Sequence, residues 1–112
     1  LSSCQHFRDF LHVSDVVEGI TRLISVDKSN TVNLGSGNFI RVRNYVKIFW
    51  NEIGGDCNKL KFGSHNISKS EPDQYKSYAD LTTIKKLTGW HPNSSLEECI
   101  RDTVVEIKQQ YR

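Results

Sequence analysis

Residues 7–18 read Phe-Arg-Asp-Phe-Leu-His-Val-Ser-Asp-Val-Val-Glu, and they decide the fold because a strand pattern changes to a helix pattern within them. The first part, Phe7 to Val13, holds aromatic and branched residues in a half-buried order, which predicts a strand. Asp15 is a candidate N-cap, and Glu18, three residues later, completes a capping box. We expect a helix that frays near residues 27–30 and buries one apolar face, made of Val16, Ile20, Leu23 and Ile24.

The middle of the chain predicts a strand, a helix and another strand. Thr31 to Leu34 is short and β-branched, and glycines at 35 and 37 follow it, as in a buried strand that ends in a turn. Apolar residues then recur at helical spacing from Val42 to Ile53, where Gly54-Gly55 ends the run. Leu60 to Gly63 predicts a further short strand.

The C-terminal part predicts a long surface loop and two helices. Residues 64–77 are polar and without period, which is typical of a functional loop. Asp80 is expected to cap a short helix that Gly89 closes. Ser95 and Glu98 form a capping box that opens the last helix, and Trp90 is expected to pack beneath that helix.

This order of elements predicts an α/β or α+β subdomain, a small sheet with about four helices, in a single domain of residues 1–112. The strands are few and short, so we expect a subdomain that leans on another part of a protein. The chain lacks methionine and opens on Leu1, so we expect a processed, excised or truncated product.

Composition excludes several classes of protein. Fifteen basic and 13 acidic residues give a net charge of +2, which is too small for a strongly basic nucleic-acid binder. The sequence predicts neither a membrane segment nor an export signal, because it contains no long apolar run. The odd set of cysteines lacks a Cys-x-x-Cys pair, which predicts reduced thiols in a cytoplasmic protein: Cys4, Cys57 and Cys99.

Two kinds of ligand site have only weak signals. Residues 35–40, Gly-Ser-Gly-Asn-Phe-Ile, carry two of the three glycines of a dinucleotide loop, so we interpret them as a tight turn. The four histidines are scattered and no cysteine has a partner at ligand spacing, so we expect no metal site. A Cys–His nucleophile pair stays open, because such residues meet only in the fold.

Arg8 is the most informative single residue, because its guanidinium stands in an apolar strand. An inward-pointing arginine needs an ion pair with Asp9 or Asp15, or it needs a phosphate ligand. Both alternatives are open at this point. Lys61 and Lys69 could add positive charge near such a ligand.

Several motifs in the same order give a resemblance that spans nearly the whole chain. They are Arg8-Asp9-Phe10-Leu11-His12-Val13-Ser14-Asp15-Val16-Val17, Val32-Asn33-Leu34-Gly35-Ser36-Gly37, Ala79-Asp80-Leu81, Gly89-Trp90-His91-Pro92 and Ser95-Leu96-Glu97-Glu98. The chain resembles the C-terminal, substrate-binding part of the NAD-dependent nucleotide-sugar epimerases and dehydratases, in the extended short-chain dehydrogenase/reductase family. The resemblance implies an N-terminal Rossmann domain that holds NAD or NADP in the parent enzyme and is absent from this chain.

The resemblance also implies roles for four residues. Arg8 matches the family arginine on the substrate diphosphate, and Phe10 would line that pocket. Many members place a second substrate-binding arginine in the long loop, where this sequence has Ser68 and Lys69 as candidates for the second phosphate contact. The family's catalytic Tyr-x-x-x-Lys is missing, since no tyrosine here is followed by a lysine at that spacing.

We therefore expect a substrate-binding domain that holds a nucleotide-diphosphate sugar, binds no cofactor itself and is catalytically inert alone. The parent enzyme would oxidise a sugar hydroxyl with NAD(P) and then epimerise, dehydrate or reduce the product. The alternative is a non-catalytic module for nucleotide-sugar binding or subunit interaction. Without a Rossmann partner, exposed apolar surface could also pair two copies of the chain into a homodimer.

Overall fold

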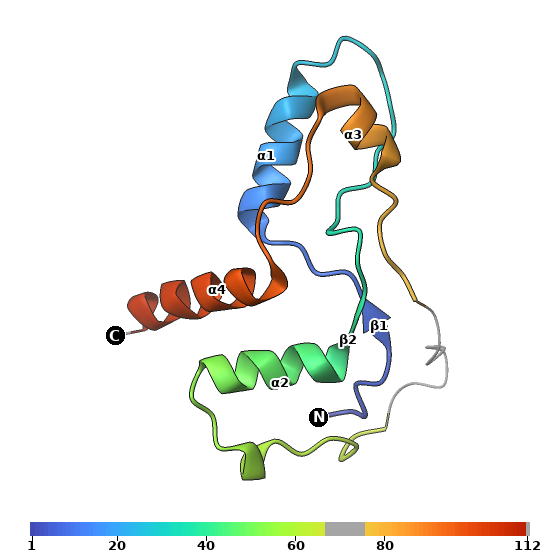
Figure 1. Ribbon diagram of the computed structural model, residues 1–112. Helices are drawn as coiled ribbons and strands as arrows, with labels where there is room; N and C mark the ends of the chain where they lie inside the picture. Colours follow the sequence, from blue (N-terminus) through green and yellow to red (C-terminus); the bar gives the residue numbers. More distant parts are fainter. Residues whose placement is uncertain (67–75, 112) are drawn as a thin grey trace.

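The computed structural model describes residues 1–66 and 76–111, and within them a small sheet is accompanied by four α-helices. The elements are β1 (Phe7–Arg8), α1 (Val13–Ile24), β2 (Ile40–Arg41), α2 (Val42–Glu52), a 3-10 turn (Cys57–Lys59), α3 (Thr82–Thr88) and α4 (Leu96–Gln110), as Figure 1 shows. β1 and β2 are antiparallel, with Phe7 opposite Arg41 and Arg8 opposite Ile40. The predicted fold class, a small α/β unit with four helices, is confirmed.

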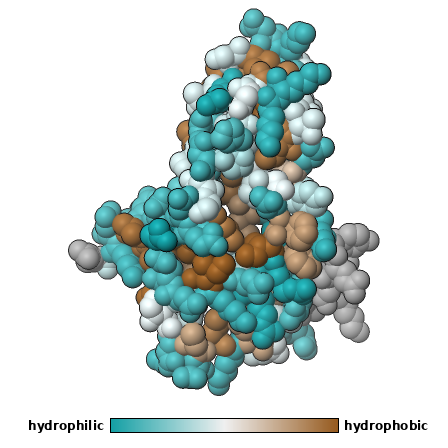
Figure 2. Space-filling view, in the orientation of Figure 1, coloured by the Kyte–Doolittle hydropathy of each residue, from teal (hydrophilic) through white to brown (hydrophobic). Residues whose placement is uncertain are grey.

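The helices fall into two lobes joined by extended segments (Figure 1). α1 packs against α3 in one lobe, and α2 packs against α4 beside the sheet in the other. The molecule measures 52 × 39 × 19 Å and has a radius of gyration of 16.7 Å. A compact domain of this length has a radius of gyration of about 13 Å. The chain is therefore a thin layer, and apolar residues reach the surface in both lobes (Figure 2).

The core of the first lobe forms around Trp90, which is fully buried together with Ile84. Leu34 packs against this cluster, and Gly19 of α1 makes room for the contact. A Cβ atom on Gly19 would lie 2.6 Å from Leu34 Cδ2 and 3.2 Å from the Trp90 indole. The prediction that Trp90 packs beneath the last helix is thus wrong, because the gap at Gly19 admits its ring between α1 and α3.

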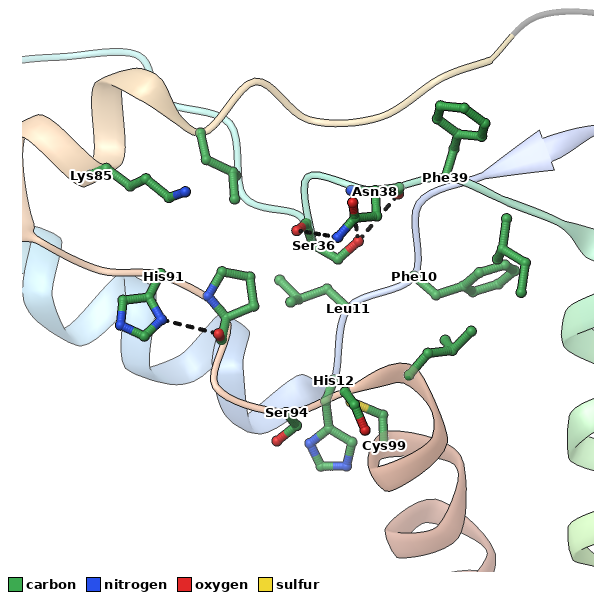
Figure 3. Close-up of a pocket in the computed structure, with 15 residues that line it drawn as sticks. Phe10, Leu11, His12, Ser36, Asn38, Phe39, Lys85, His91, Ser94 and Cys99 are labelled. Carbon is green, nitrogen blue, oxygen red and sulfur yellow. Dashed lines mark hydrogen bonds between the residues drawn. The ribbon is translucent and has the colours of Figure 1, made fainter.

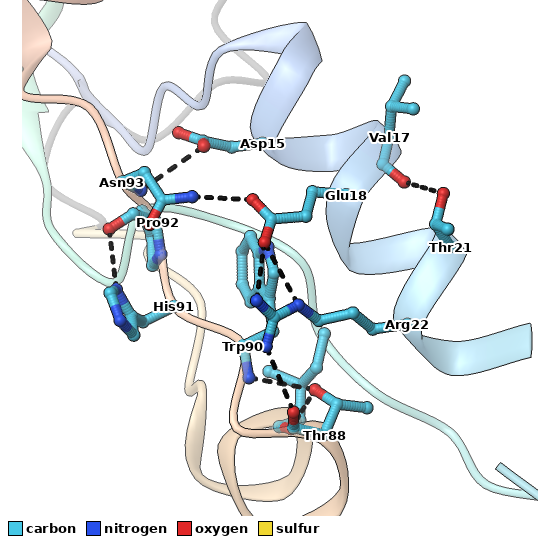
Figure 4. A network of polar contacts seen from close by, with 11 residues as sticks. Asp15, Val17, Glu18, Thr21, Arg22, Thr88, Trp90, His91, Pro92 and Asn93 are labelled. Carbon is cyan, nitrogen blue, oxygen red and sulfur yellow. Dashed lines mark hydrogen bonds and ion pairs between the residues drawn. The ribbon is translucent and has the colours of Figure 1, made fainter. Parts of the chain in front are cut away.

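The first helix begins earlier than predicted. His12 is the N-cap, with extended backbone, and its Nδ1 accepts a hydrogen bond of 3.2 Å from the Ser14 amide. Asp15 is not a cap: it is buried in the first turn, where it accepts from the Asn93 amide at 3.3 Å. Glu18 pairs with Arg22 at 2.8 Å and accepts from the Asn93 side chain at 2.6 Å, so it does not complete a capping box (Figure 4).

The predicted buried face of α1 is also wrong in part. Four apolar residues form a stripe along its outer side, 48 to 79 % exposed, which we call the α1 stripe: Val13, Val17, Ile20 and Ile24. The opposite side holds Asp15 and Gly19, which are buried, and Leu23, which packs against the Trp90 core. α1 is therefore apolar on two sides, and the described chain covers only one of them.

Three strand predictions are corrected. β1 spans only Phe7–Arg8, because Asp9 turns its carboxylate toward another loop. Residues 31–34 are extended and alternate in exposure as a strand does, but they form no ladder with any described residue. Residues 60–63 are not a strand either, since the Gly63 amide bonds only to the Ser2 carbonyl, at 3.0 Å.

Most of the remaining helix ends follow the local signals in the sequence. α2 ends where Gly54 adopts a φ of 76°. The prediction that Asp80 caps α3 is wrong: Leu81 is the N-cap, and Asp80, one residue earlier, accepts from the Thr82 amide at 2.9 Å. α3 ends at Gly89, as predicted. Ser95 and Glu98 form the predicted capping box, with bonds of 3.2 and 2.7 Å. No described helix is long and apolar enough to cross a membrane.

Replacing Trp90 tests the position of the core. We expect Trp90→Ala to lower the free energy of unfolding by about 3–5 kcal/mol, because a large buried ring leaves a cavity. Urea unfolding followed by far-ultraviolet circular dichroism measures this change. Tyr111→Ala is the control, since Tyr111 is 85 % exposed and its loss should cost less than about 0.5 kcal/mol. Equal effects of the two variants would contradict the assigned core.

Candidate functional site

The carboxylate of Asp9 joins three separate segments of the chain. It accepts hydrogen bonds from the backbone amides of Ser36 at 2.8 Å, Gly37 at 3.1 Å and Ala79 at 3.0 Å. These bonds fix the glycine-containing loop and the segment before α3 against the end of β1. The position of Arg8, the preceding residue, is set by the same contacts.

The two glycines of this loop are needed for different reasons. Gly37 has a φ of 76°, which confirms the predicted turn in the left-handed region. Gly35 is buried, and a Cβ atom there would lie 2.5 Å from Ala79 Cβ and 2.6 Å from Asp9 Oδ2. Gly35 therefore lets the backbone approach the Asp9 carboxylate closely.

The pKa of Asp9 lies below its ordinary value. Partial burial by itself raises this pKa, but hydrogen bonds from Ala79, Ser36 and Gly37 to the ionised carboxylate outweigh that effect. A carboxyl group with a lowered pKa in the folded state stabilises the fold at neutral pH. This stability is lost as the pH falls below the pKa that Asp9 has in the unfolded chain and then through its lower pKa in the folded chain.

Arg8 is exposed, and its guanidinium has no carboxylate partner among the described residues. Its Nη1 donates to the Phe7 carbonyl at 2.8 Å. The ion-pair alternative is thus wrong for both candidate partners, because Asp9 and Asp15 accept from backbone amides elsewhere. The other donors of the guanidinium fork are available to an external anion.

A cleft of about 450 Å³ opens beside Arg8, and we call it the Arg8 cleft. Its walls come from the end of β1, from residues 32–35 and from residues 77–79. The Asp9 hydrogen bonds hold these three segments together. The hydrogen bonds of Asp9 therefore fix the shape of the cleft, and the Arg8 guanidinium lies at its edge.

An aromatic and cationic cluster lies next to this cleft, and the sequence patterns did not reveal it. The ring of Phe39 contacts those of Phe7 and Tyr78, with centroids 5.5 and 5.4 Å apart. The Arg41 guanidinium lies 4.6 Å from the Phe7 centroid, and the Lys76 amine lies 4.9 Å from that of Phe39. Such cation–π contacts hold two positive charges in this cluster. The one available signal was a basic residue after an apolar one in each strand, Phe7-Arg8 and Ile40-Arg41.

Phe10 lies in a different place from Arg8. Its ring stacks on Tyr45 of α2, with centroids 3.8 Å apart and planes inclined by 8°. It lines a larger cleft of about 600 Å³ between the two lobes, which Figure 3 shows and which Arg8 does not reach. The structure does not bring Arg8 and Phe10 to one cleft. Ser68 and Lys69 lie outside the described residues.

The glycine loop at residues 35–37 does not fit the pyrophosphate of a dinucleotide cofactor. A pyrophosphate on a glycine loop takes up free backbone amides, but those of Ser36 and Gly37 are bonded to Asp9. The described residues also contain no group of three side chains placed to hold a metal ion. The cysteines at 4, 57 and 99 are free thiols. The burial of the Cys99 thiol raises its pKa, which opposes a reactive thiolate.

Fold and sequence together define the class of protein. The chain is a member of the NAD-dependent nucleotide-sugar epimerases and dehydratases, in the extended short-chain dehydrogenase/reductase group. A profile of the family described as GDP-mannose 4,6 dehydratase matches residues 1–103, and the chain belongs to this family.

Individual relatives agree with this assignment. UDP-glucuronic acid decarboxylase 2 of Arabidopsis thaliana is 30 % identical over 103 residues, which cover 92 % of this chain and 22 % of that protein. A UDP-glucose 4-epimerase from Thermotoga maritima, solved with UDP-glucose, superposes with a TM-score of 0.84 at 27 % identity, covering 96 % of this chain and 33 % of that one. RMD from Pseudomonas aeruginosa, complexed with NADPH, has the same fold at 19 % identity, with a TM-score of 0.82 and coverage of 98 and 35 %.

This chain spans only about a quarter of the length of the curated relatives that it matches.

Replacing Asp9 tests its structural role. We expect Asp9→Asn to lower the free energy of unfolding at pH 7 by about 2 kcal/mol, because the three backbone amides that bind Asp9 then lose their charged acceptor. The loss of stability between pH 5 and pH 3 should become smaller, since one contributing carboxyl group is gone. Thermal unfolding at several pH values measures both effects. Asp27→Asn, in an exposed turn, is the matched control, and an Asp9 variant as stable as this control would refute the role.

Proposed function

We propose that this chain is the substrate-binding part of a nucleotide-sugar epimerase or dehydratase, in which Arg8 binds the diphosphate of the substrate. The observation that carries the proposal is an exposed guanidinium without a carboxylate partner among the described residues, at the edge of a cleft that Asp9 holds in shape. A planar guanidinium matches two oxygens of a phosphate with parallel hydrogen bonds.

The charges around the Arg8 cleft support an anionic substrate. Arg41 and Lys76 are held on the rings of Phe7 and Phe39, and Phe39 contacts Tyr78, which lines the cleft. In the proposal, Lys69 and Ser68 supply the second phosphate contact, and Phe10 is an apolar neighbour of the bound nucleotide sugar. Lys69 provides a positive charge but cannot form the two parallel hydrogen bonds of an arginine, so its contact with the phosphate is less directional.

The chemistry of the parent enzyme requires residues beyond this chain. In the proposal, the parent oxidises a sugar hydroxyl and then epimerises, dehydrates or reduces the keto-sugar, with NAD or NADP held by a Rossmann domain. Residues 1–112 lack the Tyr-x-x-x-Lys pair, and their glycine loop is used by Asp9. Their task is to bind and orient the substrate. The free thiols support a cytoplasmic location.

The surface of α1 supports a Rossmann domain as the partner of this chain. The α1 stripe exposes four apolar side chains in one row, and residues 31–34 present an extended backbone without a ladder partner among the described residues. A strand edge beside an apolar helix face is suited to a domain that adds a strand and a covering layer. In the absence of that domain, a second copy of the chain is the expected occupant.

Replacing Arg8 tests the diphosphate site. We expect Arg8→Ala to weaken UDP binding by at least about tenfold, because a charge-assisted bidentate contact is lost. Arg8→Lys should recover part of the affinity, since it restores charge but not the fork. Calorimetry on the protein that includes its NAD-binding domain measures both. Arg101→Ala on α4 is the control for the lost charge, and unchanged UDP affinity in the Arg8 variants would end the assignment.

Polar replacements in the α1 stripe test the covering surface. We expect residues 1–112 alone to associate as concentration rises, and Val17→Ser with Ile24→Ser to reduce this association, because less apolar area is exposed. Sedimentation velocity over a hundredfold range of concentration measures it. A double variant of exposed threonines, Thr82→Ser with Thr83→Ser, is the control. A strictly monomeric wild-type chain would contradict the idea that the stripe needs a cover.

A further inference from the structure

Phe10 lines the cleft of about 600 Å³ between the lobes, and the other side chains of this cleft have no role in the function proposed above. Its walls come from five segments, and Figure 3 shows side chains from each of them around one space. Lys85 of α3 and His91 stand at one end, near the turn that contains Ser36 and Asn38. We call this space the Lys85 cleft. It shares only Leu11 with the Arg8 cleft.

The charge in the Lys85 cleft has one sign. The lining contains no aspartate and no glutamate, while Lys85 provides a positive charge and His91 and His12 provide ring nitrogens. Lys85 makes no ion pair with any described residue. His91 uses Nδ1 for a contact of 3.1 Å with the Pro92 carbonyl, which leaves Nε2 available. Asp80 lines a neighbouring cleft together with Lys85, so an anion in the Lys85 cleft would meet attraction from Lys85 and no carboxylate in the lining itself.

Much of the remaining lining is apolar, and it includes Leu11, Pro92 and Leu96 beside the hydroxyls of Ser94 and Ser95. At the N-terminus of α4, the capping box already uses the amides of Ser95 and Glu98. A cleft with an apolar wall and a few polar groups gathered at one end is the usual form of a small-molecule site.

We propose that the Lys85 cleft binds a small organic anion, with its carboxylate or phosphate between Lys85 and His91 and its apolar body against Leu11, Pro92 and Leu96. This ligand is additional to the nucleotide sugar. The apolar side chains provide affinity through burial, and the Lys85 amine together with His91 Nε2 selects a negative head group.

Calorimetric titration of the 112-residue chain with phenyl phosphate and with benzoate tests the proposal. We expect saturable binding at one site for at least one of them, and the tighter of the two identifies the head group. Benzyl alcohol lacks the charge and inorganic phosphate lacks the apolar body, so each should bind at least about tenfold more weakly. Equal affinity for inorganic phosphate, or no saturable binding of either anion, would overturn the proposal.

A matched pair of variants locates the site. Lys85→Gln should weaken binding of the tighter anion about tenfold, whereas Lys86→Gln should not, because Lys86 is the next residue on α3 and does not line the cleft. Both lysines are exposed, so both variants should unfold at the wild-type temperature, which a thermal scan checks. Arg8→Ala should leave this binding unchanged, because Arg8 does not line the Lys85 cleft. Equal losses in the two lysine variants would show only a general charge effect and would refute the site.

Discussion

The structure depends on a carboxylate that satisfies three backbone amides from distant parts of the chain. Without Asp9, the amides of Ser36, Gly37 and Ala79 would need other acceptors at positions where the backbone is partly buried. A two-residue ladder between β1 and β2 cannot hold three segments in register by itself. The hydrogen bonds of Asp9 therefore do the work that a larger sheet does in other small domains. They are also charge-assisted, which makes each of them stronger than an ordinary ladder bond.

The molecule is thin because its sheet consists of only two short strands among the described residues. With so little sheet, no broad apolar surface exists for helices to cover. Trp90 forms a small core in the first lobe, and Ile100 and Val104 of α4 are buried in the second. α1 then keeps apolar residues on a side that nothing in the described chain covers. A helix with two apolar sides belongs between two layers, and this chain supplies one.

Local signals in the sequence were sufficient for some elements. Two signals act through neighbouring backbone groups: the capping box of Ser95 and Glu98, and the glycines after Ile53. The start of α4 and the end of α2 were therefore predicted correctly. Elements that need a distant partner were predicted less well. Residues 31–34 have the alternation of a strand but no neighbouring strand to complete it among the described residues. Asp15 has the residue type of a cap, but its partner is Asn93, 78 positions away.

The separation of Arg8 from Phe10 shows why the site was harder to predict than the fold. Side chains two residues apart share one face only while the backbone stays in a strand. Here the strand ends at Arg8, because Asp9 bends the chain toward its three amides, and Phe10 turns to stack on Tyr45. Two clefts result, and Leu11 lines both of them. The carboxylate that holds Arg8 at the first cleft thus also sets the direction in which the chain enters the second.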